Sequence, residues 1–400
     1  MKTKLPGPIY ATIAGFSLFA ISMCIARFAY GPLVPSMINT HWVTKAEAGY
    51  LGAFNGLGYI IGCVMALWLP RIIGIRLLIR SSLVLTVISI GMCSWNFGFS
   101  WLALGRFLAG LAAAALVIHT IALVVRSLNT KTKDLFLGFA ISGGGVTIVI
   151  ICLALPFFIS NGPSDGWLLE AAITLVFALI AWPFVSTAPH QREPSPDSIE
   201  PLEPSRKRLV LLTGIAYMLM SVGAIPHTLF LADYMHRDLG LTVSDSISLF
   251  AIFGVGCAIG AIYVGMLIRL FGTRMSLCIS YIMGVIAIAM VLLFDHIVIV
   301  SSSSFLIGVF LSGTAALSSI RTLEAVGVSR HPHFWGLMAL GFGVGMAAGS
   351  YGMSALLSLG FDYIDLFKTA QVIVIIALGL IIFSWWRFRD LDDVAETMKQ

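Results

Sequence analysis

Charged residues are scarce in this chain of 400 residues, at 11% of the sequence against 58% hydrophobic residues. A water-soluble domain carries about 25% charged residues, because its surface must be solvated. The mean hydropathy is +0.97, and long apolar runs recur along the whole chain. This composition excludes an ordinary soluble domain and is typical of a protein whose solvent is a lipid bilayer.

Motifs for metal, nucleotide and nucleic-acid binding are missing as well. The six cysteines lie in apolar runs without C-x-x-C spacing, so we expect neither a disulfide framework nor a zinc site. The P-loop signature G-x-x-x-x-G-K-[ST] does not occur, so the chain has no ATP-driven motor of its own. The net charge of +5 is spread singly between apolar runs rather than gathered in a basic patch, so nucleic acid is not an expected partner. We expect no cofactor and no metal.

Twelve apolar runs are long enough to form membrane-spanning helices, which need about 20 residues to cross a hydrocarbon core of ~30 Å. The first run is far longer than the apolar region of a signal peptide, so we interpret it as an uncleaved first helix. The predicted spans are 10–38, 46–69, 77–97, 101–126, 135–159, 167–187, 209–234, 246–268, 275–294, 297–320, 334–358 and 366–388.

Lysine and arginine are distributed unevenly over the loops between these spans. With the amino terminus inside, 19 of the 24 fall on the inner face. The outer loops hold Lys45, Arg237 and Lys368, and Arg27 and Arg106 lie within spans. Because cytoplasmic loops are enriched in these residues, we predict a multi-pass protein of the bacterial inner (plasma) membrane with both termini in the cytoplasm.

One segment breaks the apolar pattern and separates two sets of six spans. Ala188–Arg208 holds five prolines among charged residues, which is typical of a solvated, extended linker. We therefore predict an amino-terminal six-helix bundle at 1–190, a cytoplasmic linker at 191–207 and a carboxy-terminal six-helix bundle at 208–400.

The two sets of spans are related by a single offset of 198 residues. Both copies begin on the same side, so the repeat is parallel and its axis is predicted to lie along the membrane normal. Small residues recur because they let helix backbones approach closely in lipid. The offset aligns Gly56, Gly58 and Gly62 with Gly254, Gly256 and Gly260; Arg71, Gly74 and Arg76 with Arg269, Gly272 and Arg274; Phe107, Leu108 and Gly110 with Phe305, Leu306 and Gly308; and Gly143 and Gly145 with Gly341 and Gly343.

Several local patterns resemble the major facilitator superfamily (MFS). The segment 69–76 is similar to the loop signature between the second and third helices, without its usual Asp, and 106–110 is similar to the fourth-helix R-x-x-x-G motif. The segment 138–145 resembles the fifth-helix motif of drug/proton antiporters, without its Gly-Pro step. The segments 26–35 and 48–51 resemble the YbfB/YjiJ branch of permeases.

This resemblance covers essentially the whole chain. It implies an all-α membrane protein whose twelve transmembrane helices form two six-helix bundles, related by a pseudo-two-fold axis along the membrane normal. It also implies transport by alternating access around a central cavity. The loop residues related by the offset are then candidates for gating loops, namely Arg71, Gly74, Arg76, Arg269, Gly272 and Arg274.

Arg27 and Arg106 fall inside predicted spans, where a charged side chain costs about 2.5–3.5 kcal/mol on insertion scales. In the fold that the resemblance implies, both helices line the central cavity, and we expect no carboxylate at membrane depth in the same half to neutralise them. A guanidinium can donate to two oxygens of a carboxylate, sulfonate or phosphate, so the pair predicts an anion-binding cavity. The alternative is that Arg27 reaches the headgroups and that Arg106 bonds only backbone carbonyls or a gate residue.

Other polar residues within the spans complete the candidate site. Tyr30 and Asn55 are candidates for polar groups of the cavity, although hydrogen bonding between helices explains them equally well. The predicted substrate-binding set is Arg27, Tyr30, Asn55, Arg106, Tyr217 and His227.

Four ionisable groups are candidates for carrying a coupling proton: His119, His227, Asp233 and Glu170. Histidine titrates near neutral pH, although a histidine in a helix bundle is more often a hydrogen-bonded structural residue. Asp233 and Glu170 are placed near the outer ends of their helices, where the alternative is a solvated or paired charge.

Together these features predict a secondary active transporter that moves a small organic anion across the inner membrane by alternating access. The alternative is a proton-coupled exporter of amphipathic drugs or metabolites. The expected partners are a small-molecule substrate, the lipid bilayer and protons as the coupling ion, and we expect the chain to function as a monomer. An enzyme would need paired acids or a His/Asp constellation at an interface, and the sequence shows none, so we expect no enzymatic activity.

Overall fold

The computed structural model is all-α and describes residues 7–127, 133–186, 202–327 and 329–388. Within these residues, twelve helices are long and apolar enough to cross a membrane, which confirms the predicted number of spans. The amino-terminal half comprises α1 (Pro8–Phe19), η1 (Ala20–Phe28), α2 (Tyr30–Asn39), α3 (Lys45–Trp68), α4 (Pro70–Ile73), α5 (Ile75–Met92), α6 (Phe99–Ser127), α7 (Lys133–Phe158), η2 (Ile159–Asn161) and α8 (Pro163–Val185). The carboxy-terminal half comprises α9 (Pro204–Gly223), η4 (Pro226–Phe230), α10 (Leu231–Arg237), α11 (Val243–Leu293), α12 (Ile297–Val326), α13 (His331–Ser358) and α14 (Tyr363–Arg387).

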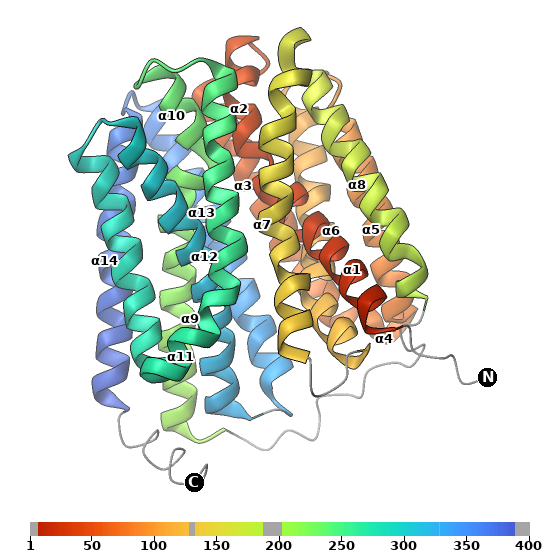
Figure 1. Cartoon of the computed structure of the whole chain (residues 1–400), viewed down its shortest axis with the longest axis vertical. Helices are drawn as coiled ribbons and strands as arrows, with labels where there is room; N and C mark the ends of the chain where they lie inside the picture. The colour runs from red at the N-terminus through yellow and green to blue at the C-terminus, as the bar shows by residue number, and fades with distance from the viewer. Residues whose placement is uncertain (1–6, 128–132, 187–201, 328, 389–400) are drawn as a thin grey trace.

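The two halves lie side by side, with α1 beginning and α14 ending at the same end of the molecule (Figure 1). We refer to this as the terminal end, and to the opposite end, where α2 and α10 lie, as the far end. Most of the predicted linker lies outside the described residues, because 187–201 are not among them. Helix α9 begins at Pro204, within the last residues of the predicted linker.

The predicted spans at 246–268 and 275–294 belong to one helical element, α11, that is interrupted by a sharp bend. Gly272 has φ +71° inside α11, and Gly74 has φ +81° between α4 and α5. Side chains other than glycine rarely adopt this left-handed backbone. Because Gly74 and Gly272 are related by the offset of 198, the two halves turn between their second and third spans in the same way.

The repeat seen in the sequence is also a repeat of helix crossings. A Cβ placed on Gly58 of α3 would lie 1.9 Å from the Phe107 carbonyl oxygen of α6, and one placed on Gly256 of α11 would lie 2.1 Å from the Phe305 carbonyl oxygen of α12. The reciprocal contacts repeat as well, since Gly110 meets the Asn55 carbonyl and Gly308 meets the Phe253 carbonyl. Each of these pairs is related by 198 residues, which is consistent with the predicted pseudo-two-fold arrangement.

The two halves contact each other mainly through α3 with α13 and through α7 with α11. Glycine makes close approach possible at both contacts: Gly56 faces the backbone of Ala347, and Gly145 faces the backbone of Ala258. At the far end α2 meets α10, and the Arg237 guanidinium donates to the Asn39 side-chain oxygen at 2.6 Å. Asn39 and Arg237 are themselves 198 residues apart, so equivalent positions of the two halves meet there.

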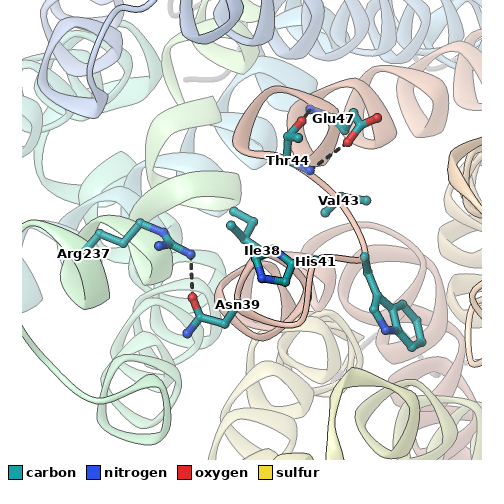
Figure 2. Close-up of a pocket in the computed structure, with 8 residues that line it drawn as sticks. Ile38, Asn39, His41, Val43, Thr44, Glu47 and Arg237 are labelled. Carbon is teal, nitrogen blue, oxygen red and sulfur yellow. Dashed lines mark hydrogen bonds between the residues drawn. The ribbon is translucent and has the colours of Figure 1, made fainter.

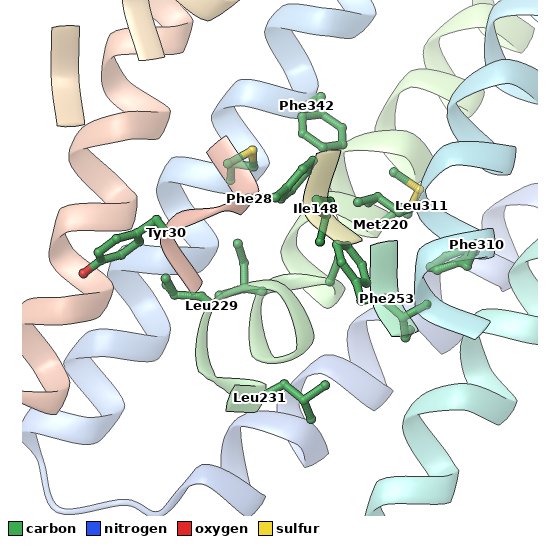
Figure 3. Packing of buried hydrophobic residues seen from close by; sticks show 14 of the residues in the cluster. Phe28, Tyr30, Ile148, Met220, Leu229, Leu231, Phe253, Phe310, Leu311 and Phe342 are labelled. Atoms are coloured by element: carbon green, nitrogen blue, oxygen red, sulfur yellow. The ribbon is translucent and has the colours of Figure 1, made fainter. Parts of the chain in front are cut away.

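Buried apolar side chains form a core that runs through both halves, and Figure 3 shows part of it. Phe28 of η1 packs edge-on against Phe253 of α11, with ring centroids 6.0 Å apart. The outer surface is apolar too, as the exposed Phe157 and Trp386 illustrate. Large apolar side chains exposed over a whole bundle are expected where lipid, rather than water, surrounds the helices.

Candidate functional site

Arg27 lies in the π-helical segment η1 in the middle of the first span. The Ala29 amide donates to the Cys24 carbonyl, five positions earlier, at 3.0 Å. Pro32 has no N–H group, so it cannot serve the carbonyl five positions before it, which is that of Arg27. π-Helical stretches are rare and occur frequently at functional sites. The sequence around Pro32 thus leaves a backbone carbonyl in mid-span for another donor.

Two polar side chains supply the donors that this segment needs. Arg106 of α6 donates from Nη2 to the Arg27 carbonyl at 3.3 Å. Asn55 of α3 donates from Nδ2 to the Ala26 carbonyl and to the Arg106 carbonyl, both at 2.9 Å. Backbone groups at membrane depth must be satisfied within the protein. Arg106 and Asn55 therefore tie η1 to α3 and α6.

The Arg27 guanidinium points across the interface toward the carboxy-terminal half. Its Cζ atom lies 4.5 Å from the ring centre of Tyr59, 4.7 Å from that of Phe342 and 5.2 Å from that of Phe28. Nη2 also contacts the thioether of Met346 on α13. Arg27 is 5% exposed, and its Nε atom is buried without a hydrogen-bond partner. In the described segments no carboxylate lies within ion-pair distance of it.

The Arg106 guanidinium points away from that interface, into the amino-terminal half. It lies 4.5 Å from the ring centre of Tyr30 and 6.0 Å from that of Trp167, and these two rings stack on each other at 5.9 Å. Its Nε and Nη1 atoms are buried without a partner. The prediction that both guanidiniums face one central cavity is therefore wrong for Arg106. The structure brings the two arginines together through the Arg27 carbonyl instead.

Glu170 corrects a second expectation, that no carboxylate at membrane depth accompanies the arginines. It lies on α8 one turn after Trp167, is 0% exposed, and has both carboxyl oxygens buried without a hydrogen-bond partner. Trp167 lies 6.0 Å from the Arg106 guanidinium, but among the described residues Glu170 and Arg106 do not form an ion pair. Distance along a span gives depth but not the direction in which a side chain points, and the sequence therefore misplaced Glu170 at an exposed interface.

Tyr30 and Tyr217, two further predicted site residues, lie next to different arginines. Tyr30 lies behind Arg27 with Arg106, and its hydroxyl donates to the Ala48 carbonyl at 3.0 Å. Tyr217 of α9 lies at the interface between the halves, where its ring packs 5.2 Å from that of Phe342. Tyr217 thus belongs to the surroundings of Arg27, and Tyr30 to those of Arg106.

His227 lies in the second π-helical segment, η4, but it faces the interior of its own half. Its Nε2 atom is 2.8 Å from Ser303 Oγ, and Ser303 donates to the Ala287 carbonyl at 2.6 Å. Since the single hydroxyl proton of Ser303 is used there, His227 Nε2 must be the donor. Its ring meets Phe367 edge-on at 5.0 Å. The structure does not bring His227 to the Arg27 site.

The remaining proton-coupling candidates have hydrogen-bond partners. His119 on α6 bonds the Ala66 carbonyl at 3.0 Å. Asp233 on α10 is fully buried, and it accepts hydrogen bonds from Arg237 at 2.9 Å and from the Tyr363 hydroxyl. Asp233 is therefore a paired charge, which is one of the two alternatives that the sequence left open.

The predicted gating-loop residues lie at the terminal end, around the two left-handed glycines. Gly74 and Gly272 make the turns described above, and Arg71, Arg76, Arg269 and Arg274 flank them. On the carboxy-terminal side, Thr273 donates to Glu324 of α12 at 2.8 Å, and Glu324 lies 3.6 Å from Arg321. A gating role for these loops stays a prediction.

A pocket of about 390 Å³ lies at the far end, between the loop that follows α2 and Arg237 of α10 (Figure 2). Its walls include the side chains of His41, Trp42 and Glu47. Asn39 is twelve positions after Arg27, so this pocket is about 18 Å from the arginine along the helix axis at 1.5 Å per residue. The pocket is thus separate from the Arg27 site. No group of three metal-binding side chains occurs in the described part of the chain.

Sequence reasoning missed the aromatic residues that surround the arginines. Tyr59 and Phe342 face Arg27, and Trp167 faces Arg106. Aromatic residues are common in apolar runs, so composition alone did not single them out. One available signal was the spacing of Trp167 and Glu170, because residues three apart lie on the same helix face.

Known proteins share this architecture. Two crystal structures of the nucleoside transporter NupG share the fold: one of a mutant form at TM-score 0.68 and a second structure at 0.66, each with 12% sequence identity. The matches cover 96% of this chain and 99% and 98% of those chains. No curated protein sequence matches significantly. The family model described as the uncharacterised MFS-type transporter YbfB matches residues 19–381, and the chain accordingly belongs to this family of MFS-type membrane transporters.

Proposed function

We propose that this transporter moves a small organic anion across the inner membrane by alternating access, with Arg27 as the anion-binding group. The observation that carries the proposal is the position of Arg27. It is a buried cation at the contact between the halves, with partners from both halves and no described carboxylate within ion-pair distance. A buried charge without a counter-ion is costly, and an anionic substrate would supply one.

The site has the location that alternating access requires. Substrate sites of such transporters lie near the bilayer midplane between the two repeats, and the repeats rock about them. The Arg27 side chain contacts Met346 on α13 of the opposite half. Its backbone is held in the amino-terminal half, because Asn55 and Arg106 donate hydrogen bonds to carbonyls of η1. Rocking of the halves would separate Arg27 from Phe342 and Met346 and open it to a ligand.

The predicted topology gives the direction of this opening. With both termini in the cytoplasm, the far end faces the outside, and there Asn39 bonds both His236 and Arg237 of the other half. The described conformation is then closed toward the outside. Loss of these contacts would be the outward-opening step.

Glu170 is the best placed of the four candidates for proton coupling. It is fully buried, both of its oxygens are without a partner, and it lies one helical turn after Trp167, whose ring is 6.0 Å from the Arg106 guanidinium. If it binds a proton in one conformation and pairs with Arg106 in the other, substrate and proton movements would be linked. Glu170→Gln would then permit exchange of substrate across the membrane of proteoliposomes but abolish substrate accumulation driven by a pH gradient.

The test of the main proposal is thermal-shift screening of the purified protein against small carboxylates, sulfonates and phosphates. Uridine serves as a neutral probe, because the structural neighbours are named as nucleoside transporters while a nucleoside carries no charge for Arg27. We expect anions to raise Tm in the wild type and not in Arg27→Gln. Lys368→Gln is the control, since it also removes one positive charge but at an exposed residue paired with Asp365.

The outcomes separate clearly. An anion that stabilises the wild type, Arg27→Gln and Lys368→Gln equally would remove Arg27 from the site. Stabilisation by uridine but by no anion would replace the proposal with transport of a neutral solute. Arg106→Ala should weaken binding as well, because it releases the Arg27 carbonyl, whereas Arg27→Lys should retain part of the binding.

A further inference from the structure

The charge around Arg27 limits the charge of its ligand. Arg27 is the charged side chain that packs against Phe28, Tyr59 and Phe342, and in the described residues no carboxylate lies within ion-pair distance of it. Arg106 offers no second guanidinium to this site, because its guanidinium packs against Tyr30 and Trp167 within the amino-terminal half and donates to the Arg27 backbone carbonyl. A site with one positive charge matches one negative charge. A second carboxylate or a doubly charged phosphate would stay unpaired in a desolvated interface.

The walls of the site are ring faces contributed by both halves. Tyr59 and Phe28 come from the amino-terminal half and Phe342 from the carboxy-terminal half, all within 5.2 Å of the Arg27 Cζ atom. The aromatic surface continues to Tyr217, next to Phe342, and to Phe253, next to Phe28. Aromatic rings prefer to pack against other rings, offset or edge-on. Once the halves separate, a planar ring on the ligand could replace the ring contacts that the two halves lose.

The surroundings of Arg27 offer few hydrogen-bonding groups to a ligand. In the described residues, the Arg27 guanidinium donates hydrogen bonds to the thioethers of Met23 and Met346, and Tyr59 and Tyr217 add one hydroxyl group each to its surroundings. Thioether sulfur is a weak hydrogen-bond acceptor. A ligand with several hydroxyl groups would therefore leave most of them unbonded, which costs affinity. This argues against sugar acids as well as against compact inorganic anions.

We infer that the transported anion is a monocarboxylate carried on an aromatic ring. This inference rests on the proposed function, since it specifies the ligand of the same Arg27 site. The carboxylate would bind the guanidinium, and the ring would pack between faces from α3 and α13.

The experiment measures affinities of the full chain in lipid nanodiscs by isothermal titration calorimetry. The probes are benzoate (an aromatic monoanion), acetate (a small monoanion), gluconate (a hydroxylated monoanion), phthalate (an aromatic dianion) and benzamide (a neutral aromatic). We expect benzoate to bind at least tenfold more tightly than each of the others. The energetic reason is that ring stacking and burial add to a carboxylate–guanidinium contact that acetate makes alone.

Two variants locate the effect. Phe342→Leu should weaken benzoate about tenfold and leave acetate unchanged, because leucine keeps the apolar surface but removes the ring. Phe310→Leu is the matched control: Phe310 is also a buried phenylalanine of the carboxy-terminal half, but it packs on Tyr281 rather than near Arg27. Arg27→Lys keeps the charge should Arg27→Gln fail to fold, and it should retain the preference for benzoate over benzamide.

The failures of the two proposals can be told apart. Equal binding of acetate and benzoate, or tighter binding of gluconate or phthalate, would overturn the aromatic monocarboxylate and leave the organic-anion transporter standing. Benzamide binding as tightly as benzoate, with no response to acetate or gluconate, would overturn both. Equal effects of Phe342→Leu and Phe310→Leu on benzoate affinity would show that the Phe342 ring does not contact the ligand.

Discussion

The two halves of this transporter bury different chemistry on the same frame of helices. The amino-terminal half places Tyr30, Asn55 and Arg106 behind Arg27, with backbone carbonyls tied by long-range hydrogen bonds. The offset of 198 puts Thr228, Phe253 and Ser304 at the corresponding positions of the other half. The close helix crossings are shared, because any bundle must let backbones approach. The charge is not shared, because uncharged residues stand at the corresponding positions of the other half, so the polar groups that hold the Arg27 carbonyl are particular to the amino-terminal half.

Valine at the crossing glycines should have the largest effect, and the same effect in both halves. In Gly58→Val and Gly256→Val the new Cβ atom would lie about 2 Å from a carbonyl oxygen that cannot move without its helix. Overpacking typically costs 1–3 kcal/mol, and a backbone clash should reach about 3 kcal/mol or more. Size-exclusion profiles and Tm of the purified variants would measure it.

Gly91→Val is the control for this pair, because a Cβ at Gly91 meets nothing within 4 Å. Loss of folded protein in Gly58→Val but wild-type behaviour in Gly256→Val would contradict the shared frame. It would mean that the similarity of the two crossings has no energetic counterpart.

The difference between the two halves should be clearest in the stabilities of Arg106→Ala and Ser304→Ala. Removing the Arg106 side chain leaves a cavity and takes the donor from the Arg27 carbonyl, so we expect a loss of about 3 kcal/mol. Ser304 Oγ is buried without a partner, so Ser304→Ala should change stability by less than about 0.5 kcal/mol. Thermal unfolding in one detergent would compare them, and similar losses in both variants would contradict the structural difference between the two halves.

Tyr30→Phe and Thr228→Val form a milder pair at another equivalent position. The Tyr30 hydroxyl bonds the Ala48 carbonyl of a different helix, whereas Thr228 bonds the Ala224 carbonyl of its own helical turn. Loss of a buried hydrogen bond costs about 1 kcal/mol, and loss of a local back-bond costs close to nothing. Tm should therefore fall only in Tyr30→Phe, and an equal fall in both variants would contradict this interpretation.

The parts of this structure that sequence could predict are those with a one-dimensional signal. Apolar run length gave the twelve spans, and the recurring glycines gave the symmetry between Gly58 and Gly256 that the crossings show. The direction in which the Arg106 side chain points had no such signal. A position along a helix fixes depth, while the direction of a side chain depends on which neighbours pack around it, here the Tyr30 and Trp167 rings.

Of the candidate site around Arg27, the sequence predicted Arg27 itself and Tyr217. Arg27 stood out because a charge in a span is rare and expensive. Tyr59 and Phe342 could not stand out, since they come from α3 and α13 and meet only where the halves touch. Pairing between distant helices is a property of the packed bundle, so it becomes visible only in three dimensions.

The smallest effect is expected where equivalent residues of the two halves meet. Asn39 bonds His236 and Arg237 at an exposed place, and exposed contacts of this kind contribute about 0.2–1 kcal/mol. Asn39→Ala should therefore leave Tm nearly unchanged. The same energy, applied to a balance between closed and open far ends, would still raise the open population up to about fivefold, since 1.4 kcal/mol is a factor of ten.

A cysteine at Ser350 can report this shift, because Ser350 is buried on α13 against Gly52 of α3, between the two halves. Maleimide labelling of Ser350→Cys should become up to about fivefold faster when Asn39→Ala is added. Ser89→Cys, buried within α5 of one half, should keep its labelling rate, because rocking of rigid halves does not expose it. Faster labelling at both positions would indicate general loosening, and an unchanged rate at Ser350→Cys would show that the contact between Asn39 and Arg237 does not hold the far end closed.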